Sequence, residues 1–263
     1  ATVDWQVSGS GANPMNAADF GGTLPSGSLT FAPGESEILI QITPSPDSHL
    51  ETREDFTVSI SSSTPGAMVL QSSAIGIVLN DDSGFVLDGT ALTTNEGNSN
   101  GLRQASFTVT RSGDLTVVAS VDWALEFAAL NGVDASDFLV GTSFSGTLEF
   151  GRGVNSLVVN LPLTPDHGVE ADEGFTVRLS NPSAGAEISI GESAGLVRND
   201  DVVLTLLPSA AIEEGSGGLT ELRYTVQRSG DLNGSDTITY SVTGSSGSPV
   251  DGTDFVGGVL PVG

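Results

Sequence analysis

Short runs in which apolar and polar residues alternate recur along this chain. Residues 157–163 and residues 175–179 each place an apolar side chain at every second position, which is the pattern of a strand with one buried face. The loop between these two runs carries Asp166, Glu170 and Glu173. The pattern therefore predicts that these carboxylates lie in one loop at the end of a sheet.

The same arrangement occurs earlier in the chain, so the sequence contains a repeat. An alternating run over residues 38–42 precedes a loop with Asp47, Glu51 and Glu54, and each of these three lies 119 residues before its counterpart in the later loop. Other segments recur after 117 to 119 residues: Val3-Asp4-Trp5 and Val121-Asp122-Trp123; Asp19-Phe20, Asp137-Phe138 and Asp254-Phe255; Asn80-Asp81-Asp82 and Asn199-Asp200-Asp201; Arg111-Ser112-Gly113-Asp114 and Arg228-Ser229-Gly230-Asp231.

The period divides the chain into one complete repeat, residues 84–201, and two incomplete ones. Residues 1–83 lack the opening strands, and residues 202–263 contain only the first half. No Pro/Ser-rich linker separates the repeats, so neighbouring domains are expected to abut closely. Because the chain opens at Ala1 without Met, we expect a processed product or a piece of something longer.

The complete repeat is expected to contain about seven short strands, the number typical of a β-sandwich. Strands are predicted near residues 85–87, 107–111, 117–123, 146–150, 157–163, 175–179 and 194–197. A tight turn is predicted at Arg111-Ser112-Gly113-Asp114, and a single helical turn at residues 125–130.

Composition excludes several classes of partner. The 263 residues include 33 acidic ones against 8 Arg and no Lys, for a formal net charge of −25. Nucleic acid and anionic membrane surfaces are therefore not expected as partners, because both need a basic face. No apolar run approaches the ~20 residues of a membrane span, so direct membrane insertion is not expected. Cysteine is absent, which excludes disulfides and thiolate-bound metals.

The repeated acidic loops carry the candidate chemistry. Crowded carboxylates repel one another, and a hard divalent cation with oxygen ligands, Ca²⁺ above all, relieves that repulsion. The alternative is solvated charge at a sheet edge, which discourages aggregation. His49 and His167 lie in these loops at different offsets, so zinc is not expected. Paired carboxylates could also suggest glycoside hydrolysis, but they recur without a nucleophile and base, so an enzyme is not expected.

The motifs taken together resemble the Calx-β repeat family. They are Asp137-Phe138, then Gly146-Thr147-Leu148-Glu149-Phe150-Gly151-Arg152-Gly153, then the acidic loop that ends at Phe175, and finally Asn199-Asp200-Asp201. The resemblance implies an all-β chain of tandem immunoglobulin-like Greek-key β-sandwiches. The family occurs in sodium–calcium exchangers, in an integrin subunit and in large bacterial surface proteins.

In functional members of the family, acidic loops bind Ca²⁺ at one end of the sandwich. The resemblance implies these ligands in the complete repeat: Glu96, Asp137, Asp166, Glu173, Asp200 and Asp201. Glu170 joins them from the acidic loop, and the corresponding candidates of the incomplete repeats are Asp19, Asp47, Glu51, Glu54, Asp81, Asp82, Glu214 and Asp254. Exchanger-type domains often carry two adjacent Asp where this chain has Pro165-Asp166 and Pro46-Asp47, and the missing carboxylate counts against tight binding of several ions.

These observations favour a Ca²⁺-binding structural region of a secreted or cell-surface protein: an adhesin stalk, or part of an extracellular matrix or filament. Calcium would rigidify its loops and domain junctions. The expected partners are other repeats of the same protein, like subunits, and cell-surface or matrix ligands. Two alternatives stay open. One is regulatory Ca²⁺ sensing, and the other is an accessory role in an extracellular hydrolase or carbohydrate-binding protein.

Overall fold

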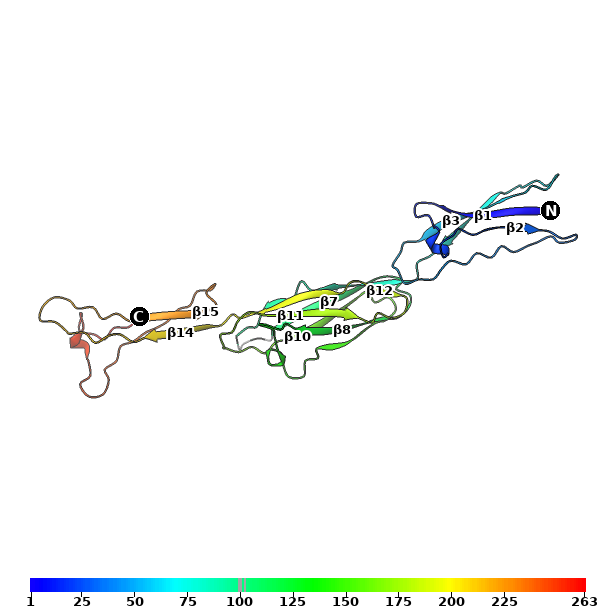
Figure 1. Cartoon of the computed structure of the whole chain (residues 1–263). Coiled ribbons are helices and arrows are strands. Elements are labelled where there is room, and N and C mark those ends of the chain that lie inside the picture. Colours follow the sequence, from blue (N-terminus) through cyan, green and yellow to red (C-terminus); the bar gives the residue numbers. More distant parts are fainter. Residues whose placement is uncertain (99–100, 102) are drawn as a thin grey trace. The chain divides into compact units, whose positions relative to one another are not determined.

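The complete repeat is a sandwich of two sheets. In the computed structural model, which describes residues 1–98, 101 and 103–263, one sheet has the order β10-β7-β5-β12 and the other β6-β13-β11-β8-β9. Figure 1 labels β7, β8, β10, β11 and β12 of these sheets. The first sheet contains β5 (Ser83–Asp88), β7 (Gln104–Gly113), β10 (Ser156–Pro162) and β12 (Ala186–Ile190). The second contains β6 (Thr93–Asn95), β8 (Ala119–Phe127), β9 (Ser145–Phe150), β11 (Glu173–Ser180) and β13 (Glu192–Arg198).

Alternation along the strands builds the core between the sheets. In β8, Val121 and Trp123 are buried at every second position, and β7 buries Phe107 in the same way. The Phe107 and Trp123 rings meet edge to face with centroids 5.3 Å apart, and Phe85 packs on Phe150 at 5.2 Å. The predicted all-β, immunoglobulin-like sandwich is confirmed.

The chain divides into two units, which are described separately. One comprises residues 1–166 and 171–198, and the other comprises residues 167–170 and 199–263. Within the described residues, the helical segments are three-residue 3-10 turns: η1 (Ala18–Phe20), η2 (Ala135–Asp137) and η3 (Gly252–Asp254). None of them could cross a membrane.

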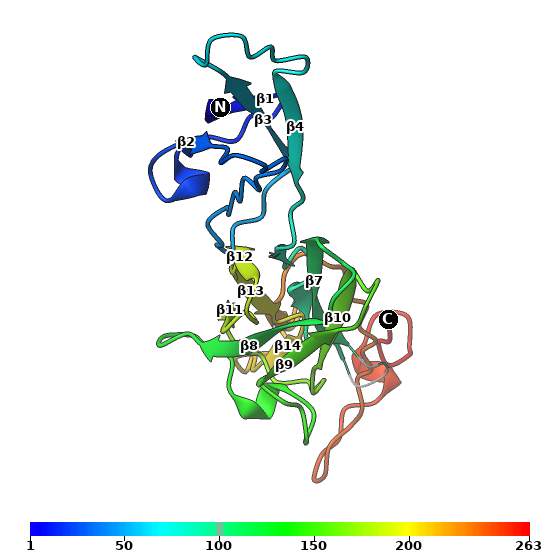
Figure 2. The same ribbon diagram turned by 90° about the vertical axis from the view of Figure 1, so that its right-hand side faces the viewer.

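Residues 1–83 form one sheet, of order β2-β1-β3-β4. It contains β1 (Thr2–Ser10), β2 (Ser26–Thr30), β3 (Glu54–Ser61) and β4 (Ser73–Val78), and β1 lies between β2 and β3 (Figure 2). This order matches β9-β8-β11-β13 of the complete repeat. The sheet buries only Val7, Met15 and Phe56 as its central cluster.

The strand predicted at residues 38–42 does not form. Its counterpart in the complete repeat is β10, which pairs with β7. Residues 1–83 contain no segment equivalent to β7, so the alternating run has no ladder to join.

Residues 202–263 contain one antiparallel pair, β14 (Val202–Leu207) and β15 (Thr225–Gly230). Val202 pairs with Gly230 as Ser83 pairs with Gly113 in the complete repeat. Both strands of this pair keep large apolar side chains exposed: Val203, Leu204, Leu206, Leu207 and Val226.

Two local predictions in the complete repeat are wrong. The helical turn expected at residues 125–130 is absent, because β8 continues as a strand to Phe127 and pairs there with Phe175. The tight turn expected at residues 111–114 is also wrong. β7 stays in the ladder through Gly113, and the chain reverses only after Asp114.

A glycine faces a phenylalanine across β11 and β13 in a way that recurs in the first repeat. Gly195 pairs with Phe175, and Gly76 pairs with Phe56. A Cβ added at either glycine would overlap the facing ring. These glycines therefore leave room for the ring on the neighbouring strand.

Gly195→Ala is predicted to lower the free energy of unfolding by about 1–3 kcal/mol, the usual cost of forcing an extra methyl into a packed core. Urea unfolding followed by tryptophan fluorescence measures the loss. Gly174→Ala is the matched control, because a Cβ there would meet its nearest atom, Cβ of Ala128, at 3.9 Å. Equal loss in the two variants would contradict the packing role of Gly195.

Candidate metal centre

The candidate ligands of the complete repeat come from segments that end or begin near one another in the second sheet. β6 runs parallel to β13, and Asn95 pairs with Arg198 at the ends of these strands. β11 runs antiparallel to β13 and begins at Glu173, opposite Val197. Glu96 follows β6 directly and Asp200 follows the end of β13, so strand order alone carries these side chains to the same end of the sandwich.

Two groups of three carboxylates are brought together there. In each group, one ligand atom from every residue lies within 4.8 Å of the others. The first group is Glu96, Asp166 and Asp201, and the second is Asp137, Glu170 and Glu173. All six are residues that the sequence singles out. Asp200, the other candidate of the complete repeat, is in neither group.

Burial distinguishes the two groups. Glu96 is 8% exposed and Asp201 only 2%, and Oδ2 of Asp201 makes no hydrogen bond within the described residues. Nδ1 of His167, whose side chain is largely exposed, lies 3.7 Å from Oδ1 of Asp201. A buried carboxylate oxygen without a donor is costly unless a cation satisfies it.

The donor set fits Ca²⁺. That ion takes six to eight oxygen ligands in flexible geometry, from carboxylates, main-chain carbonyls and water. Each group supplies three carboxylates and no nitrogen or sulfur ligand. Glu96, Asp166 and Asp201 would hold one ion, and Asp137, Glu170 and Glu173 would hold a second.

Asp137 is oriented by a capping box that sequence reasoning missed. Its carboxylate accepts from the N–H of Asp134, while Asp134 accepts from the N–H of Ser136 at 2.6 Å. The Ser136 hydroxyl and N–H lower the pKa of Asp134. The Asp-x-x-Asp spacing is the signal that could have predicted this cap.

The matching aspartates of the incomplete repeats also accept main-chain hydrogen bonds, although only Asp254 does so in a capping box. Asp254 closes an identical box with Asp251. Asp19 accepts from the N–H of Asn16 at 2.5 Å. Glu214 lies exposed in an irregular segment and is not brought together with Asp254 in a described group.

The first repeat gathers its carboxylates more loosely. An open pocket of about 400 Å³ is lined by Asp47, Glu51, Glu54, Asp81 and Asp82 together with neighbouring residues. None of these residues, nor Asp19, belongs to a described group of three. The position equivalent to Glu96 would fall before residue 1, so these 263 residues hold no counterpart of Glu96 for the first repeat.

Burial and like charge act together on the carboxylates of this pocket. Burial raises the pKa of Glu51, and the charges of Asp47 and Asp19 raise it further. Burial and the charge of Asp19 likewise raise the pKa of Glu54, and burial and Asp81 raise that of Asp82. Ionisation of these carboxylates therefore destabilises the folded state. A bound cation would favour the ionised forms and so remove this destabilisation.

Comparison with known proteins places the chain in a family. The model of the Calx-beta domain matches residues 8–83 and 99–202. The chain belongs to the Calx-beta family. Adhesion G-protein coupled receptor V1 of Danio rerio is 27% identical over 236 residues, which are 86% of this chain and 4% of the receptor, so the chain spans a small fraction of that relative.

Solved structures of Calx domains are among those to which the chain is similar. The apo form of the Calx CBD1 domain is 26% identical, covers 46% of this chain and all of its own, and has a TM-score of 0.39. The calcium binding domain CBD12 of CALX1.1 is 24% identical, covers 68% of each chain and has a TM-score of 0.41.

A pH titration tests whether the carboxylates of the first repeat respond to calcium. In EDTA, the pKa values of Glu51, Glu54 and Asp82 should exceed their unfolded values of about 4.3 for Glu and 3.9 for Asp. Their stabilising contribution is then complete below about pH 4 and is lost as pH rises through the folded pKa. Calcium should lower all three pKa values, because it favours the charged forms.

Carbon-13 NMR of the carboxyl groups measures these pKa values one by one. Asp122 is the control, because hydrogen bonds from Thr147 and Asn181 lower its pKa and it lies outside the acidic loops. Its titration should not change with calcium. Unchanged pKa values at Glu51, Glu54 and Asp82 in millimolar calcium would leave solvated charge as the explanation of this pocket.

Proposed function

We propose that this chain is a Ca²⁺-binding structural region of a secreted or cell-surface protein, as in an adhesin stalk, an extracellular matrix or a filament. Its role is binding and organisation and not catalysis. The main support is the pair of carboxylate groups at the end of the complete repeat, one of which holds the buried Asp201 oxygen that has no donor within the described residues.

Membership of the Calx-beta family and the similarity to an adhesion receptor support an extracellular, calcium-binding role. The proposed partners are other repeats of the same protein or like subunits, and through them cell-surface or matrix ligands. In this proposal calcium stiffens the acidic loops and the segments that lead from one repeat into the next, because Asp200 and Asp201 run directly into β14.

Affinity distinguishes this proposal from regulatory calcium sensing. Extracellular modules bind calcium with a Kd of about 10⁻⁴–10⁻³ M and sensors with about 10⁻⁷–10⁻⁵ M. The acidic loop carries one carboxylate at Pro165-Asp166 where two adjacent ones would bind more tightly. We therefore place this chain in the weaker, extracellular range.

Calcium should stabilise the complete repeat, and Glu173→Gln should remove much of that effect. A ligand that binds only the folded state adds about 2.7 kcal/mol at a hundredfold excess over Kd. Thermal melts over a calcium titration, each compared with EDTA, measure both the shift and the Kd. Glu149→Gln, at an exposed position of β9, is the matched control and should keep the full shift.

Superimposable melts with calcium and with EDTA would contradict the proposal. A full shift that saturates at micromolar calcium would instead support the sensing alternative. Loss of the shift in both variants would mean that the effect follows total charge and not the site.

A further inference from the structure

The same set of polar contacts links consecutive repeats at two places in the chain. The contacts at both places use main-chain atoms, asparagine amides and arginine side chains. Glu170 and Asp201 also belong to the carboxylate groups, but they take part here through their main-chain N–H and oxygen. The first place lies wholly in the unit of residues 1–166 and 171–198, and the second wholly in the unit of residues 167–170 and 199–263. Each joins the Asn-Asp-Asp end of one repeat to the Arg-Ser-Gly-Asp segment of the next.

An asparagine is at the centre of each set. Oδ1 of Asn80 accepts from the N–H of Glu51 at 3.0 Å, and its Nδ2 donates to the main-chain oxygen of Asp82 at 2.8 Å. Asn199 repeats both contacts, from Glu170 at 3.1 Å and to Asp201 at 3.3 Å. The side chain thus ties the acidic loop of its repeat to the segment by which the chain leaves it.

Asparagine is the residue that these contacts require. An amide offers an acceptor and two donors, whereas an ionised carboxylate only accepts. An aspartate could receive the N–H of Glu170 but could not donate to the oxygen of Asp201. The two neighbouring residues in each segment are aspartates, so this position differs from them in chemistry and in role.

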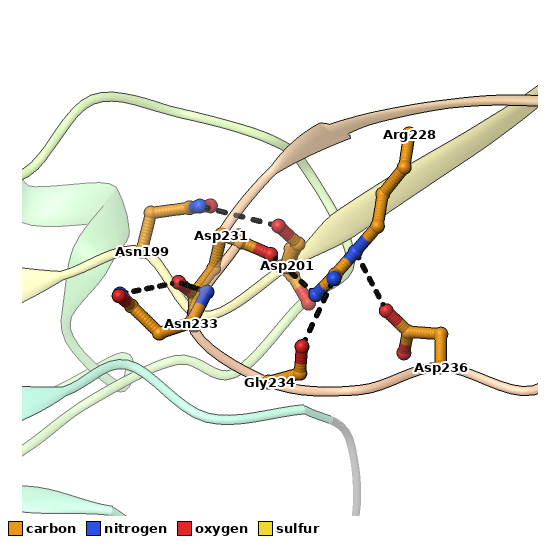
Figure 3. A network of polar contacts seen from close by, with 7 residues as sticks. All are labelled: Asn199, Asp201, Arg228, Asp231, Asn233, Gly234 and Asp236. Carbon is orange, nitrogen blue, oxygen red and sulfur yellow. Dashed lines mark hydrogen bonds and ion pairs between the residues drawn. The ribbon is translucent and has the colours of Figure 1, made fainter.

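The oxygen held by the asparagine also receives the next repeat. The N–H of Asp114 donates to the oxygen of Asp82 at 2.9 Å, and the N–H of Asp231 donates to that of Asp201 at 2.8 Å. A carbonyl oxygen has two lone pairs, so it can accept from the amide and from the incoming N–H together. Figure 3 shows Asn199, Asp201 and Asp231 in this arrangement.

Glycine and arginine shape the incoming segment. Gly113 and Gly230 have φ values of +87° and +95°, and a Cβ at either would overlap the oxygen that accepts the bond. Arg111 donates to the main-chain oxygen of Asp114, and Arg228 does the same to Asp231 at 2.9 Å (Figure 3). The arginine therefore holds the end of the strand that presents the aspartate N–H.

An apolar residue of the acidic loop covers each glycine. Cδ1 of Leu50 would lie 2.5 Å from a Cβ on Gly113, and Cγ2 of Val169 would lie 3.0 Å from one on Gly230. Leu50 and Val169 directly precede the glutamates whose N–H groups the asparagines hold. The asparagine thus also positions the apolar contact.

We propose that Asn80 and Asn199 clamp a repeated joint that closes without a metal ion, in which the Arg-Ser-Gly-Asp segment of each following repeat docks on the Asn-Asp-Asp end of the preceding one. None of the hydrogen bonds named above for the two joints uses a carboxylate, whereas the separate contact of His49 with Glu187 does. The joint therefore persists when calcium is removed, whereas the stiffening of the carboxylate loops does not.

Residue-resolved amide hydrogen exchange of the whole chain in EDTA tests this joint. In the unsubstituted protein the amides of Glu51, Asp114, Glu170 and Asp231 should be protected. Asn199→Ala should speed exchange at Glu170 and Asp231 by about tenfold, the factor expected for one ordinary hydrogen bond. Exchange at Glu51 and Asp114 should not change, so each joint is the control for the other.

Two further variants separate the clamp from general destabilisation. Asn199→Asp keeps the acceptor and removes the donor, so Glu170 should stay protected while Asp231 exchanges faster. Asn160→Ala removes an exposed contact with Gln104 and should affect neither joint. Protection of Asp231 that survives Asn199→Ala, or that appears in the unsubstituted protein only with calcium, would overturn the proposal. Both results are independent of the calcium shift in thermal melts.

Discussion

The pairing of β11 with β8 on one side and β13 on the other is the contact on which the core and the candidate metal centre both depend. Phe175 enters the core from this strand and needs Gly195 opposite it. Two residues earlier, Glu173 begins the strand and contributes to a carboxylate group. A shift of β11 by one residue would turn Phe175 out of the core and carry Glu173 away from Asp137.

The acidic loops accommodate their carboxylates and main-chain groups in chemically different ways. The raised pKa values of Glu51, Glu54 and Asp82 show that unrelieved carboxylates of the first repeat hold protons more strongly than usual. Capping boxes use other aspartates as hydrogen-bond acceptors. In our proposal a cation neutralises the tightest groups, while the asparagine amides hold the main chain of the same loops without charge.

The features that follow from the 119-residue repeat and from the alternation of apolar residues could be predicted from the sequence. These two patterns were enough to predict the sandwich, and to predict that the carboxylates gather at one end of it. The run at residues 38–42 failed because a strand also needs a neighbour, and alternation carries no information about the partner. The capping role of Asp134 and the amide role of Asn199 depend on which main-chain groups lie within reach, and only the folded loop shows this.

A long-wavelength anomalous difference map, from crystals of this chain grown with calcium, tests the central claim most directly. We predict one peak bounded by Glu96, Asp166 and Asp201 and another bounded by Asp137, Glu170 and Glu173. Peaks elsewhere would contradict it. So would a map at saturating calcium without a peak in either group, with the carboxylates bonded to protein donors or solvent, since the acidic loops would then be solvated charge.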